Sequence, residues 1–332
     1  MLKGYTKQEI SWMMYDWANS AHSVIIVTLL PIFFDTVAGY TADSVSSMST
    51  WGYATSIAML IVALAAPFLG VFGDIRGMRK KLFSFFMLLG VAACAGMAFT
   101  PGMDFTSGPV AAGKVASLIL VLYIVSVIGF DASAIYYDAF LTDVTTEDRM
   151  DIVSTMGYGL GYIGGSTIPL LIFLIMNLVG VPMLTCLAFV FGLTAVWWLA
   201  FSLPLLKNCE QTSGKPYEKG DVARSIKGVG TTIKEIIANK PMLIYILSYF
   251  FYIDGVHTVI SMATTYGTNL GLDSTGMMLA LLLVQILGLP FCLLYIKCSE
   301  KFGARTMVGF GICVYMFICI FAFFMNSLWQ FW

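Results

Sequence analysis

The chain has 332 residues, of which 59% are hydrophobic and only 11% are charged, and its formal net charge is −1. Soluble domains carry about 25% charged residues, so this chain has too few charges to cover the surface of a soluble protein. The composition therefore predicts an integral membrane protein. Neither the charge balance nor a basic aromatic patch indicates binding to nucleic acid.

Long apolar runs follow one another along the chain. A membrane-spanning helix needs about 20 mostly apolar residues, because each residue rises about 1.5 Å through a hydrocarbon core of about 30 Å. Nine runs qualify: 10–34, 51–73, 82–100, 115–140, 153–176, 183–205, 242–265, 276–297 and 306–326. We therefore expect an all-α polytopic membrane protein with nine transmembrane helices.

The positive charges are distributed on one side of this topology. If the N-terminus is cytoplasmic, 17 of the 18 lysines and arginines fall on the cytoplasmic side, and only Lys114 falls outside. Cytoplasmic loops of membrane proteins carry an excess of lysine and arginine. The sequence thus predicts a multi-pass protein with a cytoplasmic N-terminus.

One long polar segment, 206–241, separates a six-helix bundle at 1–205 from a three-helix part at 242–332. Apolar residues recur in it every three or four positions, which is typical of a helix lying along the membrane surface: Val222, Ile226, Val229, Ile233 and Ile237. The segment is either a tether with an interfacial helix or a linker that couples the two halves.

A short charged motif occurs twice, each time between two apolar runs. The copies are Asp74-Ile-Arg-Gly77-Met-Arg79 and Glu300-Lys-Phe-Gly303-Ala-Arg305. Repeated halves are typical of secondary transporters. Arg79 can reach acids on a neighbouring helix, and such an ion pair would hold one conformation and break in another. A plain positively charged turn would have the same composition, but the duplication favours the switch.

Several acids lie inside the apolar runs, where each costs about 2.5–3.5 kcal/mol and is by default a functional candidate. Asp16 and Asn19 share one helix face, and so do Asp254 and His257 in the equivalent run of the second half. With Asp131, these residues are predicted to line a central cavity and to bind a solute amine, a cation or a proton. Alternatively, Asp16 belongs to an inner gate, and His257 donates one hydrogen bond between helices.

Other polar and small residues have simpler interpretations. Asp138 is either solvated or paired with Arg149, and His22 is expected to donate one hydrogen bond between helices. The two histidines do not form a metal site, and the sequence contains no catalytic motif and no phosphate-binding loop. Four-residue spacing predicts close helix packing in the fifth run, at Gly157, Gly161 and Gly165.

Two signatures resemble a known family. The stretch from Gly70 through Asp74 and Gly77 to Lys80 is similar to the loop between the second and third helices of the major facilitator superfamily, roughly G-x-L-A-D-R-x-G-R-K. Tyr-Asp-Trp-Ala-Asn-Ser at 15–20 resembles the branch of the autophagy-related vacuolar amino-acid effluxer, which has many bacterial members. Ile75 and Met78 depart from the loop pattern, where the family has arginines.

The resemblance implies a two-bundle fold of twelve helices, of which this chain contains nine, so a C-terminally truncated form is expected. It implies a secondary active transporter of small solutes, such as amino acids, that works by alternating access in a bacterial plasma membrane. The partners implied are a small-molecule solute, the lipid bilayer and a coupling proton or cation, without a cofactor or metal. The alternative is a non-transporting membrane scaffold or receptor-like protein.

Overall fold

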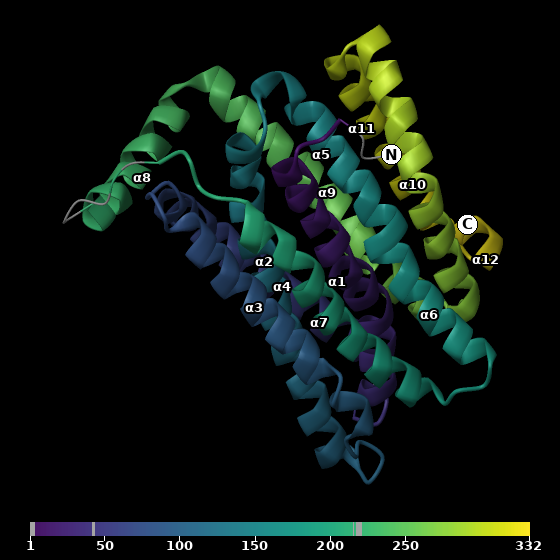
Figure 1. The fold of residues 1–332 in the computed structure, drawn as a ribbon. Helices are drawn as coiled ribbons and strands as arrows, with labels where there is room; N and C mark the ends of the chain where they lie inside the picture. The colour runs from purple at the N-terminus through teal and green to yellow at the C-terminus, as the bar shows by residue number, and fades with distance from the viewer. Residues whose placement is uncertain (1–3, 42–43, 215, 217–220) are drawn as a thin grey trace. The chain divides into compact units, whose positions relative to one another are not determined.

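A computed structural model describes residues 4–41, 44–214, 216 and 221–332, and within these residues all regular elements are helical (Figure 1). Nine segments of the described chain are long and apolar enough to cross a membrane. This confirms the all-α polytopic class and the nine predicted runs. The fifth span is composite, because it is built from four consecutive helical segments.

The elements follow one another in this order: α1 (Lys7–Ala38), α2 (Ser44–Gly73), α3 (Arg79–Met97), η1 (Thr100–Gly102), α4 (Pro109–Val144), η2 (Glu147–Arg149), α5 (Met150–Leu160), η3 (Gly161–Ser166), α6 (Thr167–Leu178), α7 (Met183–Asn208), α8 (Asp221–Ala238), α9 (Lys240–Asn269), α10 (Ser274–Phe302), α11 (Ala304–Phe323) and α12 (Leu328–Phe331). Helix packing divides the chain into two units, Met1–Val229 and Gly230–Trp332.

Helix α1 is the central element of the first unit. It contacts α2, α4, α5, η3, α6 and α7, and it buries large side chains such as Trp12, Tyr15 and Phe33. Its N-terminus is closed by a capping box, in which Thr6 and Glu9 satisfy each other's backbone N–H groups. A helix packed on so many neighbours can bury polar groups that would have no partner in lipid.

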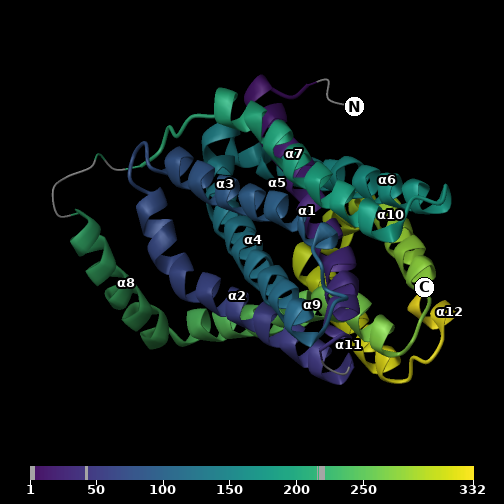
Figure 2. The same ribbon diagram turned by 90° about the horizontal axis from the view of Figure 1, so that it is seen from below.

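Helix α3 packs against α4 and α7, and the three run side by side (Figure 2). Glycines allow this close packing. A Cβ added to Gly129 on α4 would lie 2.5 Å from the backbone nitrogen of Gly90 on α3. Gly90 in turn faces the ring of Trp198 on α7. Small residues at such crossings let helix backbones approach each other inside a membrane.

The fifth span contains a π-helical turn, η3, between α5 and α6. A π-turn widens the helix and leaves a backbone carbonyl in need of a donor. The Thr167 hydroxyl donates to the Tyr162 carbonyl at 2.7 Å, and the Ser166 hydroxyl donates across to the Ser20 carbonyl of α1 at 3.3 Å. Side chains therefore satisfy the turn and bind it to α1.

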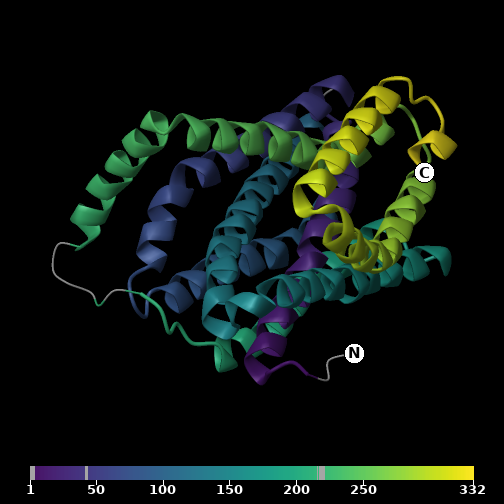
Figure 3. The same cartoon turned by 90° about the horizontal axis from the view of Figure 1, so that it is seen from above.

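The second unit contains α9, α10, α11 and the short α12. Helices α10 and α11 pack against each other (Figure 3), and the Tyr266 hydroxyl on α9 donates to the Ala322 carbonyl on α11 at 3.3 Å. Asn239 caps the start of α9 by accepting from the Met242 backbone nitrogen at 3.3 Å. The packing of α10 on α11 and the bond from Tyr266 join the three long helices, and the Asn239 cap closes the start of α9.

Helix α8 lies inside the predicted linker, and the boundary between the two units falls within it. On the predicted apolar face, Val229 is buried, whereas Ile233 and Ile237 are exposed. The side chains of Val222 and Ile226 lie outside the described residues. The division into two bundles joined by residues 206–241 stays a prediction.

Candidate functional site

A polar cluster lies between α1 and α4 in the first unit. The Tyr137 hydroxyl on α4 donates to Asp16 Oδ2 on α1 at 2.8 Å. A Cβ on Gly157 of α5 would lie 2.6 Å from the same oxygen, so the missing side chain makes room for the carboxylate. Among the described residues, no lysine or arginine forms an ion pair with Asp16. A neutral donor therefore holds this carboxylate.

Aromatic residues surround this carboxylate. Trp12 stacks on Tyr137 with ring centroids 4.3 Å apart, and its indole N–H donates to the Tyr137 carbonyl at 2.9 Å. The Tyr15 hydroxyl bonds Ser133 at 2.8 Å and accepts from the Trp198 indole at 3.3 Å. These bonds connect α1, α4 and α7 and fix the rotation of α1, which sets the direction of Asp16.

Asn19 and His22 lie further along α1 and are both buried. The His22 ring stacks on Phe130 at 4.8 Å and packs against Trp198 at 5.1 Å. Neither ring nitrogen has a hydrogen-bond partner among the described residues. The expectation that His22 donates a hydrogen bond between helices is therefore wrong, because its neighbours in α4 and α7 present aromatic rings at that level.

The remaining predicted acids differ in their surroundings. Asp131 on α4 is partly exposed, and its Oδ2 is buried without a hydrogen-bond partner in the described chain. Asp138, seven residues on, is exposed. In the second unit, Asp254 and His257 on α9 are both exposed. The structure thus brings Asp16 into a polar cluster of the first unit, whereas Asp254 and His257 belong to the other unit.

The glycines of the fifth span lie against α1. A Cβ on Gly161 would lie 2.5 Å from the Ser20 hydroxyl, and one on Gly165 would overlap the Trp17 carbonyl. With Gly157 beside Asp16, the three glycines at four-residue spacing all face the same helix. Their position matches the close helix packing that the spacing predicts.

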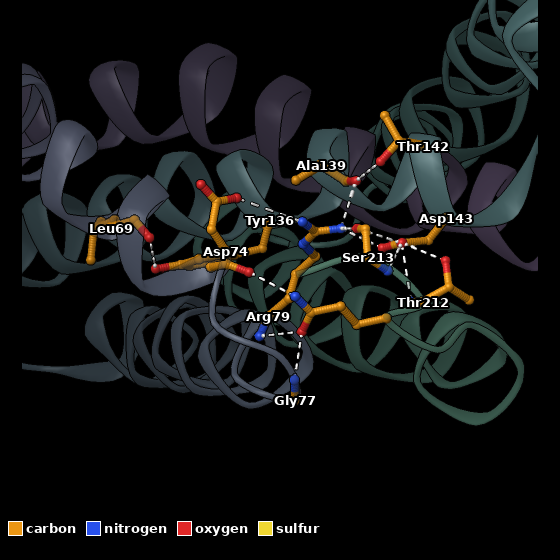
Figure 4. A network of polar contacts seen from close by, with 12 residues as sticks. Leu69, Asp74, Gly77, Arg79, Tyr136, Ala139, Thr142, Asp143, Thr212 and Ser213 are labelled. Carbon is orange, nitrogen blue, oxygen red and sulfur yellow. Dashed lines mark hydrogen bonds and ion pairs between the residues drawn. The ribbon is translucent and has the colours of Figure 1, made fainter. Parts of the chain in front are cut away.

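The first copy of the repeated motif is a dense polar network between α2, α3 and α4 (Figure 4). Arg79, at the start of α3, has a side chain that is 5% exposed and forms an ion pair with Asp143, whose side chain is fully buried near the end of α4. The Arg79 guanidinium also donates to the Ala139 carbonyl at 3.0 Å and lies 3.9 Å from Asp74. The expected reach of Arg79 to an acid on a neighbouring helix is therefore present.

The turn around Gly77 requires glycine. Its φ is +81°, a left-handed conformation that residues other than glycine rarely adopt. Gly70, earlier in the motif, lies within α2, where an added Cβ would meet open space. In the second copy, Gly303 has a φ of +82° at the N-terminus of α11. The two copies thus share their backbone turn.

The second copy lacks the matching side-chain network in the described residues. Arg305 is exposed and forms no ion pair with a described side chain. The side chain of Glu300 lies outside the described part of the chain. Within the described residues, the motif at 74–79 is the copy whose arginine binds a buried acid.

Sequence reasoning missed an ion pair at the start of α1. Arg149 donates to Glu9 at 2.9 Å from Nε and 3.2 Å from Nη2, and the Thr145 hydroxyl donates to Glu9 at 2.7 Å. The Glu9 side chain is 2% exposed. The suggested pairing of Arg149 with Asp138 is therefore wrong. Glu9 sits just before the first apolar run, and its proximity to the end of α4 depends on helix packing.

Comparison with known proteins identifies the family of the chain. A family described as "Vacuole effluxer Atg22 like" matches residues 5–332. The chain belongs to this family. It is 39% identical over 340 residues to the uncharacterized MFS-type transporter YxiO of Bacillus subtilis, covering 100% of this chain and 77% of that protein. It therefore belongs to a family of membrane transporters of the major facilitator type.

A more distant relative agrees with the Atg22-like assignment, and two solved structures share the fold. Autophagy-related protein 22-1 of Penicillium rubens is 24% identical over 176 residues, which are 50% of this chain and 30% of that protein. The partially occluded inward-open structure of the xylose transporter XylE from E. coli has a TM-score of 0.55 at 15% identity, covering 90% of this chain and 73% of that one. A D-xylose-proton symporter gives a TM-score of 0.54 at 14% identity, covering 89% and 69%. The predicted major-facilitator fold is confirmed.

Proposed function

We propose that this Atg22-like protein is a secondary active transporter that moves a small solute by alternating access, and that Asp16 and Asp131 contact the solute or its coupling cation. The observation that carries the proposal is that neither of these two acids is paired with a cation among the described side chains. Asp16 is bonded by a tyrosine, and one Asp131 oxygen is buried without a described partner.

The physical reason is the cost of an acid inside a membrane. Such a group is retained where it pairs, faces a water-filled cavity or binds a ligand. The Glu9 and Asp143 carboxylates have arginine partners, and their role is explained by those ion pairs. For Asp16 and Asp131, a mobile cation, a proton or a solute amine would supply the missing positive charge.

The solute class and the membrane follow from weaker arguments. The resemblance to the vacuolar amino-acid effluxer favours amino acids or related small metabolites, because their ammonium group matches these carboxylates. Asp254 and His257 on α9 keep their proposed role in binding the solute or a proton. The charge asymmetry supports a cytoplasmic N-terminus. The similarity to a Bacillus subtilis protein favours a bacterial plasma membrane.

The test is solute flux through the purified chain in proteoliposomes. The twenty amino acids and D-xylose are first screened for those that raise the melting temperature, and the hits are radiolabelled for uptake. We expect Asp16→Asn and Asp131→Asn each to lower uptake by about tenfold or more, with normal membrane insertion. Asp104→Asn, in the loop before α4, is the matched control. Wild-type uptake in both variants would remove these acids from the mechanism.

A further inference from the structure

Three consecutive residues beyond α7 lie against the loop that joins α2 to α3 and against the end of α4. They are Gln211, Thr212 and Ser213. Gln211 bonds the loop at both ends: its amide oxygen accepts from the backbone nitrogens of Gly77 at 2.8 Å and Arg79 at 3.3 Å, and its amide nitrogen donates to the Gly73 carbonyl at 2.9 Å. One side chain thus joins the last residue of α2 to the first residue of α3.

The next two residues bind the acid on α4 (Figure 4). Asp143 Oδ1 accepts from the Thr212 backbone nitrogen at 3.1 Å and hydroxyl at 2.8 Å. The same oxygen accepts from the Ser213 backbone nitrogen at 2.9 Å and hydroxyl at 2.8 Å. The other oxygen of Asp143 is occupied by Arg79. Both carboxylate oxygens are therefore satisfied, one by the arginine and one by the segment after α7.

The bonds from the segment after α7 to Asp143 matter because the Arg79–Asp143 ion pair is buried. Extra hydrogen bonds to a buried pair help to offset the cost of taking its two charges out of water. The side chains of Arg79 and Asp143 are 5% and 0% exposed, and the Arg79 Nε atom has no described partner. The donors of Thr212 and Ser213 are thus part of what keeps the Asp143 carboxylate charged and correctly turned toward Arg79.

We propose that Gln211, Thr212 and Ser213 form a polar clasp. It positions the Arg79–Asp143 pair and the loop 74–78 between α2 and α3, which is the loop predicted to act as a conformational switch. The clasp is the first part of the segment that leads from α7 toward α8. A displacement of this segment would therefore release Gly77, Arg79 and Asp143 together, and rearrangement of the loop would release the segment. The three clasp residues are positioning residues, since they act through Arg79 and Asp143.

Two features of the chain agree with a clasp. The backbone turns away at Gly214, whose φ is +117°, and a Cβ there would lie 2.7 Å from the Asp74 carbonyl. A side chain at position 214 would therefore push the segment off the loop. Just before the clasp, Cys209 is buried and its thiol donates to the Gln8 carbonyl of α1 at 3.6 Å. The segment is thus held at its base and is closely apposed to the loop.

The test is amide hydrogen exchange of the full chain in lipid nanodiscs, followed by mass spectrometry. Gln211→Ala should raise the exchange rate of the Gly77 and Arg79 amides about tenfold, because their acceptor is lost. Gln211→Glu, which keeps that acceptor oxygen but loses the donor to the Gly73 carbonyl, should restore part of their protection. Asp143→Ala should in turn raise exchange at the Thr212 and Ser213 amides, because both amides lose their acceptor.

The control is Glu210→Ala, at the neighbouring exposed residue, which should leave the loop amides unchanged. Amides in the middle of α4 report whether each variant is folded. Unchanged exchange at Gly77 and Arg79 in Gln211→Ala, with α4 still protected, would overturn the clasp, and so would an equal rise in Glu210→Ala. The clasp rests on the proposed transport only for what release of the loop would do in the transport cycle. Hydrogen exchange is measured without any solute transport. Failure of transport and failure of the clasp are therefore separate results.

Discussion

Glu9 and Arg149 join the start of α1 to the turn that follows α4. The Glu9 side chain is 2% exposed, while that of Arg149 is 39% exposed, so the acid depends on the arginine far more than the reverse. The Thr6 backbone N–H and the Thr145 hydroxyl donate to the same carboxylate. The buried Glu9 carboxylate therefore accepts hydrogen bonds both from the residue before α1 and from the residues after α4.

We expect Arg149→Ala to lower the melting temperature by several degrees, because it leaves a buried carboxylate without its cation. The double variant Glu9→Gln/Arg149→Ala should recover part of this loss, since the remaining amide carries no charge. The measurement is thermal unfolding of the detergent-solubilised chain, followed by intrinsic tryptophan fluorescence. If the double variant were less stable than the unsubstituted chain by the sum of the Arg149→Ala and Glu9→Gln effects, the pair would contribute nothing by its charge.

At the scale of elements, α1 and the fifth span approach each other closely because the contact is made by glycines, which have no side chain. Gly157, Gly161 and Gly165 lie against Asp16, Ser20 and the Trp17 carbonyl of α1. The π-turn η3 falls in the middle of this contact, and the hydroxyls of its last residue and the next one bond backbone carbonyls there. Helices in lipid have no hydrophobic drive to associate, so such close backbone approach is a main source of their affinity.

Gly165→Ala should therefore destabilise the first unit by about 1–3 kcal/mol, because the new Cβ meets backbone that cannot move aside cheaply. A shift of about 2–4 °C per kcal/mol is expected in a domain of this size. Gly113→Ala on α4 is the matched control, since a Cβ there has nothing within 4 Å. That variant should be neutral or slightly more stable, because alanine is a better helix former than glycine. Equal melting temperatures for the two variants would argue against the close contact.

At the scale of the whole molecule, the distribution of lysine and arginine predicts which side of the membrane each loop faces. Seventeen of its 18 positive side chains fall on one side of the nine-span topology. The Arg79 network, the Glu9–Arg149 pair and the clasp all involve residues on that side. The proposed cytoplasmic face therefore also holds the polar contacts that connect neighbouring helices.

Thiol labelling in intact cells tests this orientation. We expect Ser107→Cys, in the exposed loop between α3 and α4, to react with an impermeant maleimide added outside. Glu210→Cys should react only after the membrane is opened. The unsubstituted chain, with its seven cysteines, supplies the background. Labelling in the opposite pattern would invert the topology and place the clasp outside the cell.

The sequence alone was enough to predict the nine spans, the family and the glycine face of the fifth span, and it carries the proposed sidedness. The spans depend on composition within about 20 residues and on the thickness of the bilayer, and the sidedness depends on the charges of the loops. The family follows from two short signatures, and the glycine face follows from a four-residue spacing. It also indicated that Arg79 would reach an acid on a neighbouring helix, because a short spacing and a charged break are visible without a fold.

Only the tertiary structure decided which partners meet. Arg79 binds Asp143, and its backbone N–H is held by Gln211, 132 positions away. Arg149 binds Glu9 and not Asp138, and His22 meets aromatic rings where a hydrogen bond was expected. The physical reason is that such contacts depend on how each helix is rotated and shifted along its neighbours. Hydropathy determines neither the rotation nor the shift, because every face of a buried transmembrane helix is apolar enough to pack against a neighbour. The packing of glycines and aromatic side chains selects one arrangement.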